Sequence, residues 1–300
     1  MKKYKYTADS TFQIGTYHVN SVSPCQDYAQ TYLGPEGDSA LLVISDGCSS
    51  GGQTDVGARI LAHKFLVKAK ERRATIPTKA VEVNLTNKDL KYLGLEIKDF
   101  LATLVTIEAN QNMVQATVIG DGVFVLQLAN GTRYIYQIEW ANNAPAYPVY
   151  FSEAGKAVGM PQRFIDFHME TSQPHCIKML VVKPGSLEEQ VEYKAIYQEA
   201  ECAPNVISTF PHGCDVVMAA IFSDGIDQVR HVETGERISV VEAVDSCLSF
   251  KNTTGSFVKR RIRKQIADWK KLGYEPFDDL SCAVLMLEQI DDGEEVSDGN

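Results

Sequence analysis

The sequence predicts an α+β domain, in which mainly antiparallel β-sheets are covered by helices that are grouped along the chain. Short apolar runs separated by turn residues recur throughout, whereas helical patterns occur mainly near residues 54–100 and 239–272. Strands joined by short turns are antiparallel neighbours, and a parallel sheet would need a helix after nearly every strand. We therefore expect one layered domain over residues 1–288, followed by an acidic, disordered tail over residues 289–300.

Nine runs have the length and composition of strands, and three of the connections between them carry hairpin residues. The turn signals are Asn110–Asn112, Gly120–Gly122 and Asn130-Gly131, which favour antiparallel pairing of the flanking runs. Four further segments have apolar residues at helical spacing, beginning with the stripe from Ala58 to Ala69. The predicted strands are 40–45, 101–109, 113–119, 123–128, 133–139, 164–170, 176–182, 216–222 and 280–287, and the predicted helices are 54–69, 87–100, 239–250 and 256–272.

Composition excludes several classes of protein. The chain has 300 residues, 44% of them hydrophobic and 23% charged, with a formal net charge of −10. That charge argues against nucleic acid as a partner, and no apolar run is long enough to span a membrane. The basic first residues are not followed by an apolar segment, and the seven cysteines form no CxxC pair. We therefore expect a cytoplasmic protein without a disulfide framework or a structural zinc site.

Aspartates recur at the ends of apolar strands. Asp46, Asp121 and Asp224 each follow such a run and precede a glycine, and the pair Asp278-Asp279 stands just before another run. Asp-Gly is also a common turn dipeptide, so one instance alone means little. Several acids that converge at one end of a sheet repel one another, and a divalent cation relieves this repulsion. Oxygen ligands without His or Cys favour Mg²⁺ or Mn²⁺.

The order of these motifs resembles the type 2C, metal-dependent serine/threonine protein phosphatases, particularly their bacterial branch. The similar segments extend from about Gln13 to Leu287. They are Pro24–Asp27, Val43–Gly47 with the glycines after it, Ala102–Leu104, Gly120–Gly122, Ser223–Asp227 and Asp278–Ser281. The resemblance implies two antiparallel sheets in a sandwich flanked by helix pairs (a four-layer αββα arrangement), with a metal centre at one end.

The resemblance also implies roles for individual residues. Asp46 would bridge two divalent cations, Mn²⁺ or Mg²⁺, with the Gly47 carbonyl on one of them and Asp224 and Asp278 completing the other. Asp121 would help to hold a weaker third cation, and Asp27 would lie in the shell around the metal waters. The reaction implied is hydrolysis of phosphoserine or phosphothreonine by a metal-activated water.

Two positions depart from the family pattern. Gln26 stands where much of the family has a Glu that reaches the second metal through water, and the phosphate-binding Arg falls on Val22. These departures keep an alternative open, in which the chain is a catalytically weak or inactive phosphatase-like module that binds a phosphoprotein or regulatory partner. A glycosidase is disfavoured because paired acids alone would not explain the repeated Ser-Asp-Gly motif.

Three further expectations concern the surroundings of the site. His18 is a candidate acid for the leaving alkoxide, although a strand residue without a catalytic role is also compatible with it. The motifs contain no nucleophile with an adjacent base, so no covalent phosphoenzyme is expected. Residues 144–163, rich in Pro and Gly, are expected to form a long loop where the family carries a flap. The expected partner is a phosphoprotein, opposing a serine/threonine kinase.

Overall fold

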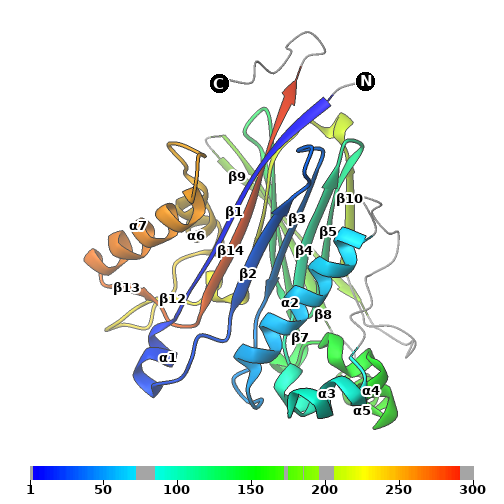
Figure 1. Cartoon of the computed structure of the whole chain (residues 1–300). Helices are drawn as coiled ribbons and strands as arrows, with labels where there is room; N and C mark the ends of the chain where they lie inside the picture. The colour runs from blue at the N-terminus through cyan, green and yellow to red at the C-terminus, as the bar shows by residue number, and fades with distance from the viewer. Residues whose placement is uncertain (1–2, 72–84, 172–174, 185, 196–205, 291–300) are drawn as a thin grey trace.

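Two antiparallel sheets pack face to face in the computed structural model, which describes residues 3–71, 85–171, 175–184, 186–195 and 206–290 (Figure 1). The first sheet has the strand order β1-β14-β11-β6-β7-β8-β9, and the second has the order β10-β5-β4-β3-β2. The first comprises β1 (Lys3–Gln13), β14 (Leu280–Ile290), β11 (Val216–Phe222), β6 (Gly122–Leu128), β7 (Arg133–Trp140), β8 (His175–Lys183) and β9 (Ser186–Ala195). The second comprises β10 (Val206–Pro211), β5 (Met113–Ile119), β4 (Leu104–Asn110), β3 (Ser39–Ser45) and β2 (Tyr28–Leu33), while β12 (Val229–His231) pairs separately with β13 (Tyr274–Pro276).

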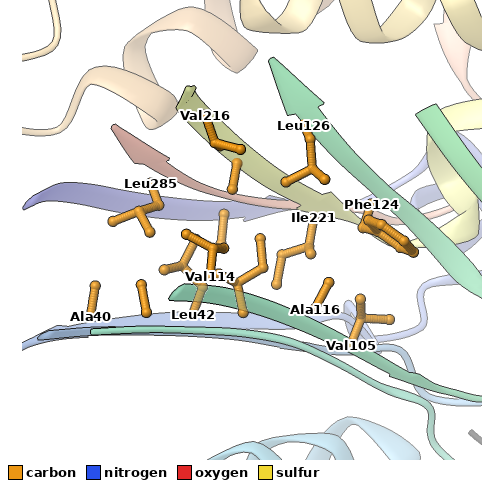
Figure 2. Packing of buried hydrophobic residues seen from close by; sticks show 14 of the residues in the cluster. Ala40, Leu42, Val105, Val114, Ala116, Phe124, Leu126, Val216, Ile221 and Leu285 are labelled. Carbon is orange, nitrogen blue, oxygen red and sulfur yellow. The ribbon is translucent and has the colours of Figure 1, made fainter. Parts of the chain in front are cut away.

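The two sheets bury an apolar layer between them. Figure 2 shows how side chains of one sheet, such as Leu42 and Val105, face Phe124, Ile221 and Leu285 of the other. These strands read as nearly continuous apolar runs because their second faces are covered as well. Removal of this apolar area from water is the main term that holds the sheets together.

Helices cover both outer faces, which gives four layers. Helix α2 (Thr54–Glu71) places Leu61, Phe65 and Leu66 on the second sheet. On the other side, α6 (Val240–Leu248) and α7 (Phe257–Lys271) place Val244, Ile262 and Trp269 on the first sheet. The remaining helices are α1 (Thr16–Ser21), α3 (Asn87–Leu93), α4 (Glu153–Ala157) and α5 (Met160–Thr171). The α+β class and the sandwich predicted from the sequence are confirmed.

Three local predictions were wrong. Residues 164–170 belong to helix α5 and form no strand, because Pro161, Phe164 and Ile165 are buried at the i, i+3, i+4 spacing of a helix. The segment 144–163 is no simple loop. It contains the 3₁₀ turn Pro148–Phe151, helix α4 with its Ser152 cap, and the start of α5. Pro148 and Pro161 lie in first helical turns, where the missing N–H costs nothing.

The third error concerns the segment 87–100, which does not form one helix. Helix α3 ends at Leu93, where Gly94 adopts a left-handed conformation with φ of 68°, and a separate 3₁₀ turn covers Ile97–Phe100. At the other end of the chain, β14 runs to Ile290, two residues beyond the expected end of the domain at residue 288, and residues 291–300 lie outside the described residues. Among the described residues, no helix is long and apolar enough to cross a membrane.

Candidate metal centre

The ends of strands from both sheets meet at one end of the sandwich. Asp46 follows β3, Asp121 joins β5 to β6, Asp224 follows β11, and Asp278 precedes β14. The antiparallel registers bring these points together, because Ile44 of β3 pairs with Val105 of β4 and Phe222 of β11 pairs with Cys282 of β14. This is the end of the molecule near α1, opposite the start of β1 and the end of β14 (Figure 1).

Four carboxyl groups line one pocket. Asp46, Asp121, Asp224 and Asp278 are all partly exposed there. The rest of the wall is formed by Gly47, Cys48, Ser49, Ser50, Thr103, Asn143, Pro145 and Tyr147. Thr103 fixes the loop that follows β3, because its N–H donates to the Asp46 carbonyl (2.8 Å) and its hydroxyl accepts from the Asp46 N–H (3.2 Å). The sequence-predicted acids are thus brought to one cavity by regular strand ends.

The electrostatics of the pocket are dominated by burial and by repulsion between like charges. Burial and the charges of Asp27 and Asp224 raise the pKa of Asp46 well above its usual value. Burial and Asp224 do the same to the pKa of Asp121. Burial also raises the pKa of Asp224 to about 6. It raises the pKa of Asp278 too, partly offset by the hydrogen bond from the Asp279 N–H and by His18 and Arg230. Carboxyl groups in this state would gain from a bound cation.

Two further aspartates, Asp27 and Asp279, are buried and do not line the pocket. Asp27 is buried; its Oδ2 accepts from the Ser223 hydroxyl (2.7 Å), while its Oδ1 has no hydrogen-bond partner. Burial and the charge of Asp279 raise the pKa of Asp27 to about 8. A buried carboxyl oxygen without a partner costs free energy, and a hydrogen from a metal-bound water or a proton would satisfy it.

Asp279 has a different set of contacts from its neighbour Asp278. Its Oδ1 accepts from the N–H of Gly15 (2.7 Å), and its Oδ2 accepts from the N–H of Gln26 (2.6 Å) and lies 2.9 Å from His18 Nδ1. Nδ1 of His18 makes no hydrogen bond to any described residue, so the two groups are in close contact without being joined by one. Asp279 therefore joins the first loop of the chain to the start of β14.

His18 and Gln26 both point toward Ser49. His18 is buried, and its Nε2 lies 3.3 Å from the Ser49 hydroxyl oxygen, which donates to Gln26 Oε1 at 3.0 Å. Ser49 is exposed and lines the pocket with the four acids. His18 thus lies behind Ser49, and a serine with an adjacent histidine stands where the motifs predicted no such pair.

The donor set suits a hard divalent cation, although the side chains are not gathered around one. Within the described part of the chain, no three His, Cys, Asp or Glu side chains already have the spacing of a metal site. Carboxylate and backbone carbonyl oxygens are nevertheless the donors that Mg²⁺ and Mn²⁺ prefer. The raised pKa values of four neighbouring acids and the unpartnered oxygen of Asp27 show what a cation would compensate. The residues present therefore fit such an ion after side-chain adjustment.

Sequence reasoning placed the acids together but missed several residues around them. Asp46, Asp121, Asp224 and Asp278 share the pocket, whereas Asp27 lies under it and His18 is separated from it by Ser49. Ser49, Asp279 and Ser223 were not predicted. The Asp-Asp pair could have signalled Asp279, because neighbours in an extended segment point to opposite sides. Nothing in the turn sequence distinguishes Ser49 from Ser50.

The fold and pocket define a class: a two-sheet α+β sandwich with an acidic, partly buried cluster of the kind that binds hard cations. The sequence profile described as protein phosphatase 2C matches residues 14–145. This match confirms the resemblance of the chain to the protein phosphatase 2C family. It includes Asp27, Asp46 and Asp121, whereas Asp224 and Asp278 lie beyond it.

Other comparisons are more distant. Serine/threonine phosphatase Stp1 from Staphylococcus aureus superposes with a TM-score of 0.47 at 10% identity, with 94% of each chain covered. The serine/threonine phosphatase of S. agalactiae gives 0.48 at 13% identity, with 94% of this chain and 100% of that chain covered. RsbX in complex with magnesium gives 0.42 at 12% identity, with 96% and 100% covered. No similar sequence was found among the curated proteins.

Proposed function

We propose that the chain is a metal-dependent phosphatase that hydrolyses phosphoserine and phosphothreonine in proteins. The observation that carries this proposal is the pocket in which Asp46, Asp121, Asp224 and Asp278 meet with raised pKa values. Repulsion among these carboxylates is unfavourable in the folded chain alone. Two bound Mn²⁺ or Mg²⁺ ions would replace this repulsion with attraction between the carboxylates and the cations. The family resemblance supplies phosphoryl transfer as the reaction.

Each acidic residue would have its own role in holding the cations. Asp46 would serve both cations, the Gly47 carbonyl one of them, and Asp224 and Asp278 the other. Asp121 would contribute with Asp224 to a weaker third ion, and Asp27 would accept hydrogen bonds from below. The bound cations would supply positive charge that activates water and neutralises the phosphoryl oxygens. A phosphoprotein made by a serine/threonine kinase would be the natural substrate.

One observation keeps a second function in view, that of a weak or inactive module that binds a phosphoprotein or regulatory partner. Gln26 carries no charge, and its side chain is occupied by Ser49. Val22, where the family pattern has an Arg, is 92% exposed. Neither position supplies the charge that the family pattern has there, so phosphate would have to be held by the cations or by another basic residue.

A manganese titration distinguishes the two functions. We expect turnover of p-nitrophenyl phosphate and of a phosphoserine peptide to rise with Mn²⁺, to be lost in EDTA and to be unaffected by tartrate. Asp46→Asn should reduce turnover to background and remove calorimetric Mn²⁺ binding while the far-ultraviolet circular dichroism stays unchanged. Asp38→Asn, at the exposed opposite end of β3, is the matched control and should behave as wild type. Manganese binding without turnover in wild type would favour the binding module.

A further inference from the structure

Trp140, the last residue of β7, makes a contact that the acid motifs do not explain. Its indole Nε1 donates a buried hydrogen bond of 2.8 Å to the carbonyl of Gly120, the residue before Asp121. An indole has one N–H group and no acceptor, so it can hold only one such oxygen, in one direction. The contact therefore fixes the peptide group that joins Gly120 to Asp121.

The loop that carries Asp121 needs such a support. Gly120 and Gly122 have φ angles of 95° and 137°, so Asp121 stands between two residues of high conformational freedom. A Cβ atom on Gly120 would lie 2.8 Å from Cγ2 of Thr103, the residue that also holds the Asp46 backbone. Thr103 thus limits the loop by contact, whereas the hydrogen bond from Trp140 directs it.

Trp140 is itself held by a cluster of aromatic rings. Its ring meets that of Phe164 edge-on with the centroids 5.4 Å apart, and the Phe151 ring meets Phe164 in the same way at 5.9 Å. All three side chains are buried in one apolar cluster. Phe164 belongs to α5 and Phe151 to the 3₁₀ turn before α4, and both helices lie at the same end of the sandwich as α1 (Figure 1). The indole thus connects this cluster with the loop of a pocket acid.

We propose that Trp140 is a positioning residue that joins the aromatic cluster to the Asp121 loop and thereby sets the affinity of this loop for a divalent cation. The inference rests on the proposed function to the extent that Asp121 helps to hold a cation. It goes further because it gives a role to a residue that has no oxygen or sulfur atom to offer a cation and acts through Asp121.

The effect on affinity follows from the freedom of the loop. Mg²⁺ accepts only nearly octahedral arrangements of its ligands, so a ligand that is held in place binds it more tightly. Without the indole, Gly120 and Gly122 would allow the Asp121 backbone more conformations, and cation binding would have to restrict them. The buried Gly120 carbonyl would also lose its side-chain donor, which costs free energy. Replacement of a residue that orients a metal ligand typically lowers metal affinity by roughly 10- to 100-fold.

The chain contains two tryptophans, which provide a matched pair of variants. Trp140→Phe keeps an aromatic ring for the cluster and removes the N–H group. We expect it to weaken Mn²⁺ binding by roughly 10-fold in calorimetry, in the binding step that Asp121→Asn removes. The control is Trp269→Phe, in the apolar layer under α7, which should leave Mn²⁺ binding unchanged. Far-ultraviolet circular dichroism and urea unfolding check that both variants are folded.

A spectroscopic measurement on the wild-type chain tests the contact while the cluster is intact. The two indole N–H groups give two ¹H–¹⁵N signals, and the signal that remains in Trp269→Phe belongs to Trp140. Addition of diamagnetic Mg²⁺ should shift the Trp140 signal as the Asp121 loop binds the cation, because the indole hydrogen is bonded to the Gly120 carbonyl. The Trp269 signal should stay in place, and Asp121→Asn should abolish the shift at the same Mg²⁺ concentration.

Binding and turnover separate this inference from the proposed function. A Trp140 signal that does not respond to Mg²⁺, or equal Mn²⁺ affinities of Trp140→Phe and wild type, refutes the positioning role even if the chain is an active phosphatase. Equal weakening in Trp269→Phe also refutes it, since the effect would then be a general loss of stability. Manganese binding that Trp140→Phe weakens, without turnover in wild type, supports the positioning role and refutes the phosphatase. A wild type that binds neither Mn²⁺ nor Mg²⁺ refutes both.

Discussion

Asp224→Asn should make the metal-free protein more stable at neutral and alkaline pH. In the folded chain, burial and the charges of Asp278 and Asp227 raise the pKa of Asp224 from 3.8 to about 6. A shift of about two units corresponds to roughly 3 kcal/mol that folding loses once Asp224 must ionise. Water in the pocket screens part of this repulsion, so we expect the substitution to raise the free energy of unfolding by about 1 to 3 kcal/mol.

The pH dependence follows from the direction of the shift. An acid whose pKa is raised on folding binds more protons in the folded state between the two pKa values. The part of the free energy of unfolding that is linked to Asp224 is therefore fully retained below its unfolded pKa of 3.8. It declines as pH rises and is lost above its folded pKa of about 6. The difference between Asp224→Asn and wild type should be near zero at about pH 4 and reach its plateau by about pH 8.

The assay is urea unfolding in EDTA at a series of pH values. Asp89→Asn is the matched carboxyl-to-amide control, and its effect on the free energy of unfolding should have the opposite sign. The reason is that the backbone N–H of Thr86 and the ammonium of Lys64 lower the pKa of Asp89. Asp89 completes a capping box, so its substitution should destabilise the protein by up to about 1 kcal/mol at neutral pH. If Asp224→Asn were also destabilising at pH 8, Asp224 would have a stabilising partner, and the repulsive picture of the pocket would be wrong.

Two further predictions concern the core and the first acid motif. Phe65 lies in the apolar layer between α2 and the second sheet, so Phe65→Ala should lower the free energy of unfolding by about 3 to 5 kcal/mol. The control Val67→Ala, on the exposed side of the same helix, should lower it by less than about 1 kcal/mol. Urea unfolding measures both values. Gln26→Glu should lower the manganese concentration needed for half-maximal turnover, because it adds a negative charge near the proposed cations. The new carboxylate can still accept the hydrogen bond from Ser49. If the variant needed more manganese than wild type, residue 26 would not interact with the cations.

Strands made of continuous apolar runs were predictable because such runs are easily recognised in the sequence. The strands that were missed contain both polar and apolar residues. Strand β1 alternates exposed lysines with buried Tyr4 and Tyr6, so its pattern of period two is carried by residues that are only partly apolar. It is nevertheless fixed in place by eleven paired positions along β14, from Lys3 to Gln13. Pairing between the two ends of the chain cannot be read from either segment alone, because the partner is remote in sequence.

The site was predictable to the extent that strand ends determine it. Asp46, Asp121 and Asp224 follow regular strands, so a sandwich necessarily brings them to one end. The contacts of His18 were not accessible in this way, because α1 is held by backbone contacts to a segment some 260 positions later, including Tyr17 N–H to the Phe277 carbonyl. The sequence pattern shows which residue types are available, and tertiary contacts decide which of them face the pocket.

Two glycines explain how Asp278 and Asp279 can serve different purposes although they are adjacent. A Cβ atom on Gly15 would lie 2.2 Å from the backbone carbon of Asp278, and one on Gly225 would lie 1.8 Å from the carbonyl oxygen of Asp279. The backbone of the pair is thus clamped between the first loop of the chain and the turn after β11, with no room for a side chain on either side. Held in this way, one carboxyl faces the pocket and the other faces His18. The two aspartates therefore share one rigid support, and a change at either glycine would disturb both of them together.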